Sequence, residues 1–423
     1  MASREPGTLI VGAGQASVSL AAALRDAGHD GPVTIVGEER LPPYERPPLS
    51  KGYLAGHRDE ASLVIRSREW LAERGVALLT DERVTALDRD EMGGVATTAS
   101  GQRLDFARLV LATGAAARTL PVPGADLEDV LAIRTLVDAD RLAAALRADG
   151  PLVVIGGGFL GLEVAAVARE IGREVTVVEV TDRLLARAVS PALSDFFRAA
   201  HERRGVRVLL GASVVRILGV DGHVAGVELQ GGDVLRASTV VVSIGSAPRV
   251  ELAAHLGLAL DGGVVVDEFA LGSDRVTVAV GDCACVPQFF GRGLPGLVRP
   301  ESVQHATDHG RSAAATLLGQ PTAYRAVPWF WSDQGDLRLQ IVGLVAGADH
   351  TVVRGDPGTE AFSLLHYRDG LLVAAECVGS AADHLVVKRG LEKGLTIEPG
   401  AAADTGVPLK RLLSPPAQGS ADR

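Results

Sequence analysis

A chain of 423 residues is longer than one compact core usually holds, so two or three domains are expected. Hydrophobic residues make up 47% of it and glycines number 50, which excludes a largely disordered chain and indicates many tight turns. The 42 Lys and Arg against 52 Asp and Glu give a net charge of −10, which excludes a general nucleic-acid-binding protein.

The first apolar segment is too short for the core of a signal peptide. Only residues 9–11 are apolar in a row before the first glycine, whereas such a core needs about 7–15 apolar residues. Residues 151–168 carry one charge, Glu163, and approach the length of a membrane span. Glycines interrupt them, however, so a strand, a glycine turn and a helix explain them better. We therefore expect a cytoplasmic protein that does not bind membranes.

The first strand–helix–strand unit has the pattern of an adenine dinucleotide site. An apolar strand over residues 8–11 runs into Gly12 and Gly14, a helical pattern follows, and a second strand covers residues 33–36. The glycines let the backbone approach a pyrophosphate at the helix N-terminus, where free N–H groups favour an anion. Glu38 follows the second strand and is suited to accept hydrogen bonds from a ribose.

The same pattern returns in the middle of the chain. A strand over residues 152–155 is followed by a complete glycine fingerprint, Gly156, Gly158 and Gly161, and Glu179 comes after the next strand. A carboxylate there repels a 2′-phosphate, so NADH is favoured over NADPH. Arg183 and Arg187 leave NADPH open, because either side chain could reach a phosphate.

Further elements lie outside these two units and indicate an α/β protein with a mixed C-terminal part. They are expected at residues 67–74 (helix), 76–104 (several strands), 109–112 and 240–245 (apolar strands), 303–318 (helix), 337–342, 362–367 and 371–376 (strands) and 384–393 (helix). The tail is rich in Ser, Pro, Ala and Gly and is expected to be disordered.

Six short strings, in order along nearly the whole chain, resemble the FAD-dependent ferredoxin reductases of oxygenase and cytochrome P450 systems. Putidaredoxin reductase and the biphenyl dioxygenase ferredoxin reductase typify this family. The strings are PYERPPLSK (43–51), ATG (112–114), RTL (134–136), GDCA (281–284), ESVQ (301–304) and PWFWSDQ (328–334).

The resemblance implies two Rossmann-like domains in a glutathione-reductase-like arrangement, followed by a C-terminal α+β domain. The expected parts are an FAD domain (1–112 and 242–325), an NADH domain (113–241), a C-terminal domain (326–412) and a disordered tail (413–423).

The resemblance also implies site residues. Lys51 would lie by the flavin and pair with Glu163, and Trp331 would lie beside the ring and the nicotinamide; these three are the catalytic candidates. The residues expected to bind FAD are Gly12, Gly14, Ala16, Glu38, Arg46, Lys51, Val84, Thr113, Gly114, Arg134, Asp282 and Val303. Those expected to bind NADH are Gly156, Gly158, Leu160, Gly161 and Glu179.

Three positions depart from the family pattern. Ser17 replaces the third glycine, His305 stands where asparagine is common, and Arg249 replaces the asparagine of Gly-x-x-Pro-Asn. None of them removes a group that must react, so affinity and fine geometry are what they would change.

The sequence offers neither a dithiol pair nor a metal site. No cysteine lies between Glu38 and Arg66, where related disulfide reductases carry a redox pair. Three cysteines are also too few for a disulfide framework. His305 and His309 have metal-ligand spacing on one helix face, but no third ligand is evident, so we expect them to be structural.

The expected activity is electron transfer from NADH through FAD to a 2Fe–2S ferredoxin that serves an oxygenase. Because such ferredoxins are acidic, we expect a basic docking patch made of Arg66, Arg311, Lys388 and Arg389. Two alternatives stay open: an NADH oxidase or quinone-type reductase on the same scaffold, and an NADH-sensing flavoprotein that signals to a partner. A monomer or weak dimer is expected.

Overall fold

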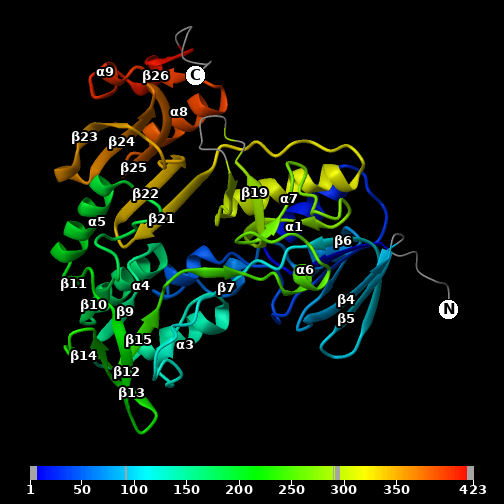
Figure 1. Ribbon diagram of the computed structural model, residues 1–423, viewed down its shortest axis with the longest axis horizontal. Helices are drawn as coiled ribbons and strands as arrows, with labels where there is room; N and C mark the ends of the chain where they lie inside the picture. Colours follow the sequence, from blue (N-terminus) through cyan, green and yellow to red (C-terminus); the bar gives the residue numbers. More distant parts are fainter. Residues whose placement is uncertain (1–6, 91–92, 289, 291–295, 417–423) are drawn as a thin grey trace. The chain divides into compact units, whose positions relative to one another are not determined.

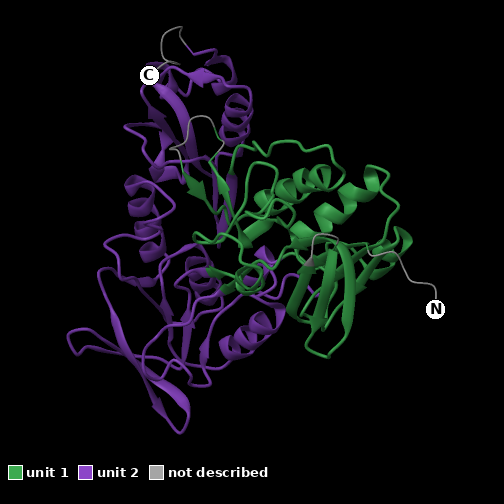
Figure 2. Ribbon diagram, turned by 45° about the vertical axis from the view of Figure 1, so that its right-hand side comes forward, with its two compact units in different colours: residues 1–45, 61–116, 247–328 green, residues 46–60, 117–246, 329–423 purple. Residues whose placement is uncertain are grey.

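The computed structural model describes residues 7–90, 93–288, 290 and 296–416. The chain divides into two compact units, coloured separately in Figure 2, and each is described by itself. Unit 1 contains residues 1–45, 61–116 and 247–328, and unit 2 contains residues 46–60, 117–246 and 329–423. The chain leaves unit 1 within strand β7 (Ala115–Ala117) and re-enters it within β16 (Ser246–Pro248).

Unit 1 is built on a seven-stranded sheet (Figure 1). Its strands, in spatial order, are β3 (Val76–Leu79), β2 (Val33–Val36), β1 (Gly7–Val11), β6 (Arg103–Leu111), β5 (Gly93–Thr98) and β4 (Val84–Asp90), with β18 (Val278–Ala279) paired to β6. The central strands β2, β1 and β6 run parallel, and the carboxyl ends of β1 and β6, which are buried, meet at one edge.

Smaller elements complete unit 1. They are the helices α1 (Gln15–Asp26), α2 (Arg68–Glu73), α6 (Glu251–His255) and α7 (Val303–Leu317), and the sheet of β17 (Val264–Val265), β19 (Ala284–Pro287) and β20 (Leu297–Val298). Helices α1 and α7 pack closely because Gly310 has no side chain: a Cβ there would lie 2.5 Å from the carbonyl oxygen of Ala16. This packing positions the start of α1.

Unit 2 contains a second parallel sheet. Its strands, in spatial order, are β11 (Val206–Leu209), β10 (Val175–Val178), β9 (Leu152–Ile155), β15 (Thr239–Val242) and β8 (Val130–Leu131). The helices of this part are α3 (Leu136–Arg147), α4 (Phe159–Glu170) and α5 (Pro191–Arg203), and a three-stranded sheet is formed by β12 (Val214–Val220), β13 (His223–Leu229) and β14 (Val234–Arg236).

The C-terminal part of unit 2 is an antiparallel sheet with helices. Its strands, in spatial order, are β21 (Trp329–Gln334), β22 (Leu337–Gly343), β25 (Leu371–Val378), β24 (Ala361–Arg368) and β23 (His350–Asp356). The remaining elements are α8 (Ala381–Glu392), α9 (Pro399–Ala402) and the strand pair β26 (Thr396–Ile397) and β27 (Leu413–Ser414). No helix among the described residues is both long and apolar enough to span a membrane.

The beginning of the expected disordered tail differs from the structure. Leu413 and Ser414 form β27, and Leu413 pairs with the fully buried Ile397. A Cβ on Gly390 would lie 2.6 Å from the side chain of Leu413, so that glycine leaves the room that Leu413 fills. An apolar residue with this packing keeps the chain ordered through residue 414. Residues 417–423 of the expected tail lie outside the described residues.

Residues 46–60 belong to unit 2, whereas the sequence analysis places them in the FAD domain. Arg46 Nη1 donates to the carbonyl oxygen of Arg134 at 2.6 Å. Tyr53 donates its hydroxyl to Asp140 Oδ1 at 2.6 Å, and burial together with this bond raises the pKa of Tyr53 to about 12. These contacts, made to residues more than 80 positions further on, attach the segment to helix α3 and the residues before it.

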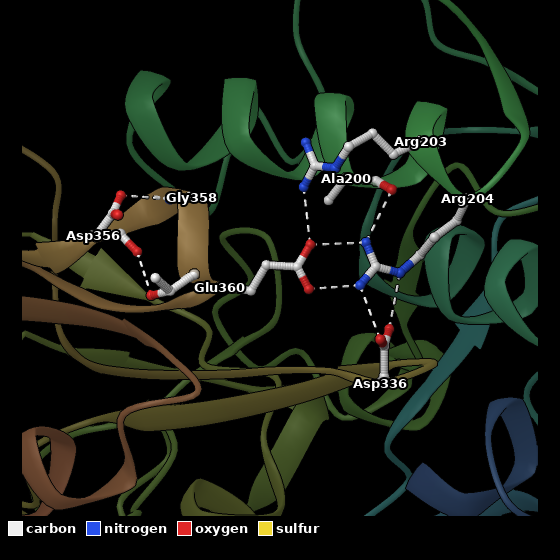
Figure 3. Close-up of polar contacts among 8 residues, drawn as sticks. Ala200, Arg203, Arg204, Asp336, Asp356, Gly358 and Glu360 are labelled. Atoms are coloured by element: carbon white, nitrogen blue, oxygen red, sulfur yellow. Dashed lines mark hydrogen bonds and ion pairs between the residues drawn. The ribbon is translucent and has the colours of Figure 1, made fainter.

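A cluster of ion pairs joins α5 to the C-terminal sheet inside unit 2 (Figure 3). Arg204 donates to both carboxylate oxygens of Glu360, at 3.0 and 2.7 Å, and to both oxygens of Asp336, at 2.9 and 3.0 Å. Arg203 adds a bond of 2.9 Å to Glu360. Mainly through its bond with Arg204, the pKa of Glu360 falls to about 2. Two-pronged pairs of this kind are stronger than single exposed contacts.

Replacing Arg204 by alanine is expected to lower the free energy of unfolding of unit 2 by about 1–2 kcal/mol, because one guanidinium serves two carboxylates. Urea unfolding in a Trp70→Phe background, followed by the fluorescence of Trp329 and Trp331, measures this. Arg198→Ala is the control: its single exposed pair with Glu202, at 3.1 Å, should contribute about 0.3–0.5 kcal/mol. Equal losses in the two variants would contradict a special role for the cluster.

Candidate functional site

The first glycine turn, at the end of β1, is shaped for an anion. Gly12 has φ +110°, and a Cβ on it would lie 2.1 Å from the carbonyl oxygen of Ala112, so only glycine fits there. Gly14 begins α1 without a side-chain cap, and the first helical turn has no acidic residue. A Cβ on Gly14 would meet nothing within 4 Å. The start of α1 therefore lacks a side-chain cap and has room beside Gly14, as a bound pyrophosphate requires.

The second turn, at the end of β9, repeats this geometry. Gly156 has φ +109°, and its Cβ would lie 2.3 Å from the carbonyl oxygen of Ser243. Gly158 begins α4 without a side-chain cap, the first turn has no acidic residue, and a Cβ on Gly158 would meet nothing within 4 Å. Each unit thus has one turn that fits the pyrophosphate of a dinucleotide.

Ser17 replaces the third glycine without blocking the first turn. In the second turn a Cβ on Gly161 would lie 2.3 Å from the carbonyl oxygen of Gly156. The fully buried Ser17 instead donates its hydroxyl to the equivalent carbonyl oxygen, that of Gly12, at 2.5 Å. This hydrogen bond ties the serine side chain to the turn, so a residue larger than glycine is accommodated at this position.

The two acidic residues have different surroundings. Glu38 forms an ion pair with Arg249, and both side chains are about one-third exposed. Glu179 Oε2 accepts a hydrogen bond from the backbone N–H of Gly157 at 2.7 Å, and Oε1 accepts two from Thr181 at 2.8 Å. Glu179 is therefore fixed against the glycine turn, with its charge near the start of α4.

Two arginines could reach the 2′-phosphate of NADPH. One of them, Arg183, forms its hydrogen bonds with residues that follow it closely in the chain. Its guanidinium donates to the carbonyl oxygens of Val189 and Ala186 and to the hydroxyl of Ser194, at 2.9, 2.5 and 2.8 Å. Arg187 lies by Gly245, where a Cβ would be 3.1 Å from its Nη2. Only Arg187 remains as a candidate for contact with a phosphate.

The expected FAD residues of unit 1 lie on several of its elements. Thr113 donates its hydroxyl to the carbonyl oxygen of Arg249 at 2.7 Å, and Gly114 accepts a bond from the backbone N–H of Arg249. The others occupy the following places: Ala16 in α1, Val84 at the start of β4, Asp282 in the 3-10 turn Gly281–Cys283 and Val303 at the start of α7. The expected role of each of them stays a prediction.

In unit 2 the structure brings Lys51 and Glu163 together. Lys51 follows the 3-10 turn Pro47–Ser50, and its Nζ lies 2.8 Å from Glu163 Oε2. Glu163 is on α4 and only 4% exposed. Because a buried carboxylate is costly unless it is paired, this contact is a strong constraint on the segment that carries Lys51. The ion pair implied by the family resemblance is present.

Aromatic side chains border the start of α4. Phe159, the first residue of that helix, packs on Phe330 with ring centroids 4.6 Å apart. Trp331 is half-buried in β21, 5.6 Å from the ring of Trp329. Leu160, an expected NADH contact, lies in the first turn of α4. The proposed positions of Trp331 and Leu160 beside a nicotinamide stay predictions.

Sequence reasoning missed the polar partners of Glu163. Its carboxylate also accepts hydrogen bonds from Ser50 and Ser332, and Ser332 in turn contacts Gln334. A signal was available, because Ser332 and Gln334 are two residues apart in a strand and so share one face. Both are fully buried, which marks that face as the inner one.

His305 and His309 are buried side chains with local partners, and the three cysteines are buried as well. His305 Nδ1 lies 2.9 Å from the Tyr324 hydroxyl, and His309 Nδ1 accepts from the backbone N–H of Gly281 at 3.4 Å. Burial lowers the pKa of His305 to about 4. The three cysteines are free thiols. Within the described ranges, no group of three or more His, Cys, Asp or Glu could hold a metal ion.

The expected docking residues are divided between the units and mostly have partners. In unit 1, Arg66 stacks on the ring of Trp70 at 4.9 Å and Arg311 lies 3.6 Å from Asp308. In unit 2, Lys388 pairs with Glu392 at 2.6 Å, and Arg389 is a neighbour of Lys388 on α8. The structure does not assemble the four into one patch within either unit.

Comparisons with known proteins agree with this geometry. A family model described as pyridine nucleotide-disulphide oxidoreductase matches residues 7–310, and one described as reductase C-terminal matches residues 329–413. The chain is 44% identical to rhodocoxin reductase of Rhodococcus erythropolis, over 96% of this chain and 94% of that protein. It is 37% identical to putidaredoxin reductase of Pseudomonas putida, over 96% of each chain.

Two solved structures resemble the whole chain. A ferredoxin reductase from Rhodopseudomonas palustris has a TM-score of 0.93 at 40% identity, covering 97% of this chain and all of that one. A chain of the covalent putidaredoxin reductase–putidaredoxin complex has a TM-score of 0.92 at 36% identity, covering 97% of this chain and 98% of that one. The chain therefore belongs to the pyridine nucleotide-disulphide oxidoreductase family, and within it to the ferredoxin reductases related to putidaredoxin reductase.

Proposed function

We propose that this protein takes electrons from NADH, passes them through FAD and delivers them to a 2Fe–2S ferredoxin that serves a cytochrome P450 or a Rieske-type oxygenase. The observation that carries the proposal is the pair of glycine turns, one in each unit, each with uncapped helical N–H groups and open space in front. Two such turns in one chain provide for two dinucleotides. When bound, FAD takes two electrons from NADH as hydride and gives them up one at a time.

The residues of the chain bind and orient these groups. The turns at Gly14 and Gly158 would hold the two pyrophosphates, and Glu38 and Glu179 would accept hydrogen bonds from ribose hydroxyls. The Lys51 ammonium, paired with Glu163, would supply positive charge that favours an anionic reduced ring. These roles rest on the geometry of each turn and on the family relationship.

Anaerobic titration of the purified protein with NADH tests this function. The yellow colour should bleach with about one equivalent of NADH per flavin, and an added oxidised 2Fe–2S ferredoxin should then be reduced. Rapid NADH consumption in air without ferredoxin would instead indicate an oxidase or quinone-type reductase. Slow electron transfer with strong NADH-dependent dimerisation would indicate a sensor. A protein that purifies without flavin would contradict the proposal.

The preference for NADH is expected to depend on the charge of Glu179. In a Glu179→Gln variant, the ratio of kcat/KM for NADH to that for NADPH should fall about tenfold or more, because a neutral amide no longer repels the 2′-phosphate. Glu174→Gln is the matched control, since it removes one negative charge from an exposed position before β10. A ratio that stays at the wild-type value in both variants would rule out this role.

Ferredoxin docking is expected to need the positive charge of Arg311. Arg311→Glu should slow ferredoxin reduction about tenfold, while NADH-dependent ferricyanide reduction is unchanged, because the second assay needs no protein partner. Arg275→Glu, another exposed arginine of unit 1 paired with an aspartate, serves as the control. Equal losses in the two assays would reject Arg311 as a docking residue. The cytoplasmic location and the weak or absent dimerisation stay predictions for fractionation and sedimentation experiments.

A further inference from the structure

A buried chain of hydrogen bonds in unit 2 ends at Glu163. Its carboxylate Oε2 is shared by Lys51 Nζ at 2.8 Å and the Ser50 hydroxyl at 2.5 Å. Oε1 accepts the hydroxyl of Ser332 at 2.6 Å. Each oxygen therefore has its own donors, and rotation of the carboxylate would break one set. A carboxylate buried to this extent needs all of these partners to offset its lost hydration.

The chain continues from Ser332 through two more buried side chains. Gln334 Nε2 lies 3.2 Å from the Ser332 hydroxyl, and Gln334 Oε1 lies 2.7 Å from His201 Nε2. Ser332 and Gln334 are fully buried on one face of β21, and His201, on α5, is 1% exposed. Side chains from α4, β21 and α5 are thus linked in one unbranched row within unit 2.

The direction of these bonds follows from the carboxylate at the end. A carboxylate paired with a lysine only accepts, so Ser332 must donate to it. The Ser332 oxygen then accepts from the Gln334 amide N–H, and the Gln334 carbonyl oxygen accepts from His201 Nε2–H. This requires the His201 tautomer with its proton on Nε2. Burial lowers the pKa of His201, in agreement with a neutral ring.

The other ring nitrogen of His201 supports this assignment. Nδ1 is buried and has no hydrogen-bond partner among the described residues. A bare acceptor nitrogen costs less to leave without a partner than an N–H donor that would be buried unpaired. The hydrogen-bond network therefore assigns the proton to Nε2, and His201 is the first donor of the row.

We propose that Ser332, Gln334 and His201 are positioning residues that orient the Glu163 carboxylate and, through it, the Lys51 ammonium. The proposal rests on the proposed function, because the orientation matters only if Lys51 acts on a bound flavin. Loss of the row should leave Glu163 Oε1 without its donor and let the carboxylate turn. The Lys51 ammonium would then be held less precisely beside the bound flavin. This change lowers the rate of flavin reduction without weakening NADH binding.

Ser332→Ala tests the row, with Ser332→Thr as the conservative variant and Ser363→Ala as the matched control. Ser363 is also a fully buried serine of the C-terminal sheet, and its hydroxyl donates to Asp383 at 3.0 Å. In stopped-flow experiments, Ser332→Ala should slow the limiting rate of flavin reduction about tenfold with an NADH Kd within about twofold of wild type. The flavin midpoint potential should become more negative. Ser332→Thr, which keeps the hydroxyl, and Ser363→Ala should match wild type.

Nitrogen-15 NMR of the histidine rings provides a readout independent of turnover, on both the FAD-free and FAD-loaded protein. His201 should show the Nε2–H tautomer in wild type and lose that preference in Ser332→Ala. A proton on Nδ1 in wild type would overturn the proposal. So would a folded Ser332→Ala protein whose rate and potential equal those of Ser363→Ala. If wild-type protein takes up no flavin or is not reduced by NADH, the proposed function fails instead, and the tautomer still reports on the row.

Discussion

Gly158→Ala is expected to raise the KM for NADH by about tenfold or more while leaving the melting temperature and the FAD content unchanged. The backbone of Gly158 has φ −81° and ψ 177°, which alanine adopts without strain. The added methyl group would meet no protein atom within 4 Å. Any effect must therefore come from what approaches the turn from outside, namely the pyrophosphate of NADH. Steady-state kinetics and thermal unfolding check the two halves of this prediction.

Gly14→Ala is the reciprocal variant, since a methyl group there also meets nothing within 4 Å. It should reduce FAD retention and leave the binding of NAD⁺ to the FAD-free protein unchanged. The two variants together assign one dinucleotide to each turn. If both variants bound FAD and NADH like wild type, the pyrophosphates could not lie at these helix starts.

Acid is expected to destabilise unit 1 through its buried histidines. Burial lowers the pKa of His305 from 6.5 to about 4. Between these values the unfolded chain binds a proton that the folded chain does not, so the free energy of unfolding falls as the pH falls through this window. His305 alone should account for a loss of about 3 kcal/mol by pH 4. Burial lowers the pKa of His309 as well, which adds to the effect.

Urea unfolding at pH 7, 5.5 and 4.5 measures this loss in unit 1, followed by the fluorescence of Trp70 in a background where Trp329 and Trp331 are replaced by Phe. His305→Asn introduces the residue common in the family and should remove much of the pH dependence, since the amide does not titrate. His255→Asn, at an exposed position on α6, should leave it intact. Parallel pH profiles for wild type and His305→Asn would show that another group causes the acid sensitivity.

Local patterns predicted the strands that frame both glycine turns. The structure has β2 and β9 at the residues expected, and β1 starts one residue earlier, because buried parallel strands are short β-branched runs, here ending at glycine. The two acidic residues after those strands were predicted in the same way. Their partners were not: the pairing of Glu38 with Arg249 joins residues 211 positions apart, which no spacing rule reveals.

The unit to which the segment with Lys51 belongs could not be predicted from its position in the sequence. The family resemblance implied that this segment belongs to the FAD domain, but its side chains contact Arg134, Asp140 and Glu163 in unit 2. The Lys51–Glu163 pair could be predicted only through the family resemblance. The spacing of Ser332 and Gln334 places them on one face of a strand, yet their role needs the position of Glu163, which tertiary packing alone determines.

Ser17 shows that the third position of the glycine fingerprint can be occupied by a residue other than glycine. The third position does not demand glycine as such, because a serine fits there with its hydroxyl donating to the carbonyl oxygen of Gly12. Searches that accept only Gly or Ala there would overlook chains of this kind. Serine at this site also ties the loop to the helix. Ser17→Ala keeps the Cβ that serine already has and removes only the donor, so it isolates the contribution of this hydrogen bond to the turn.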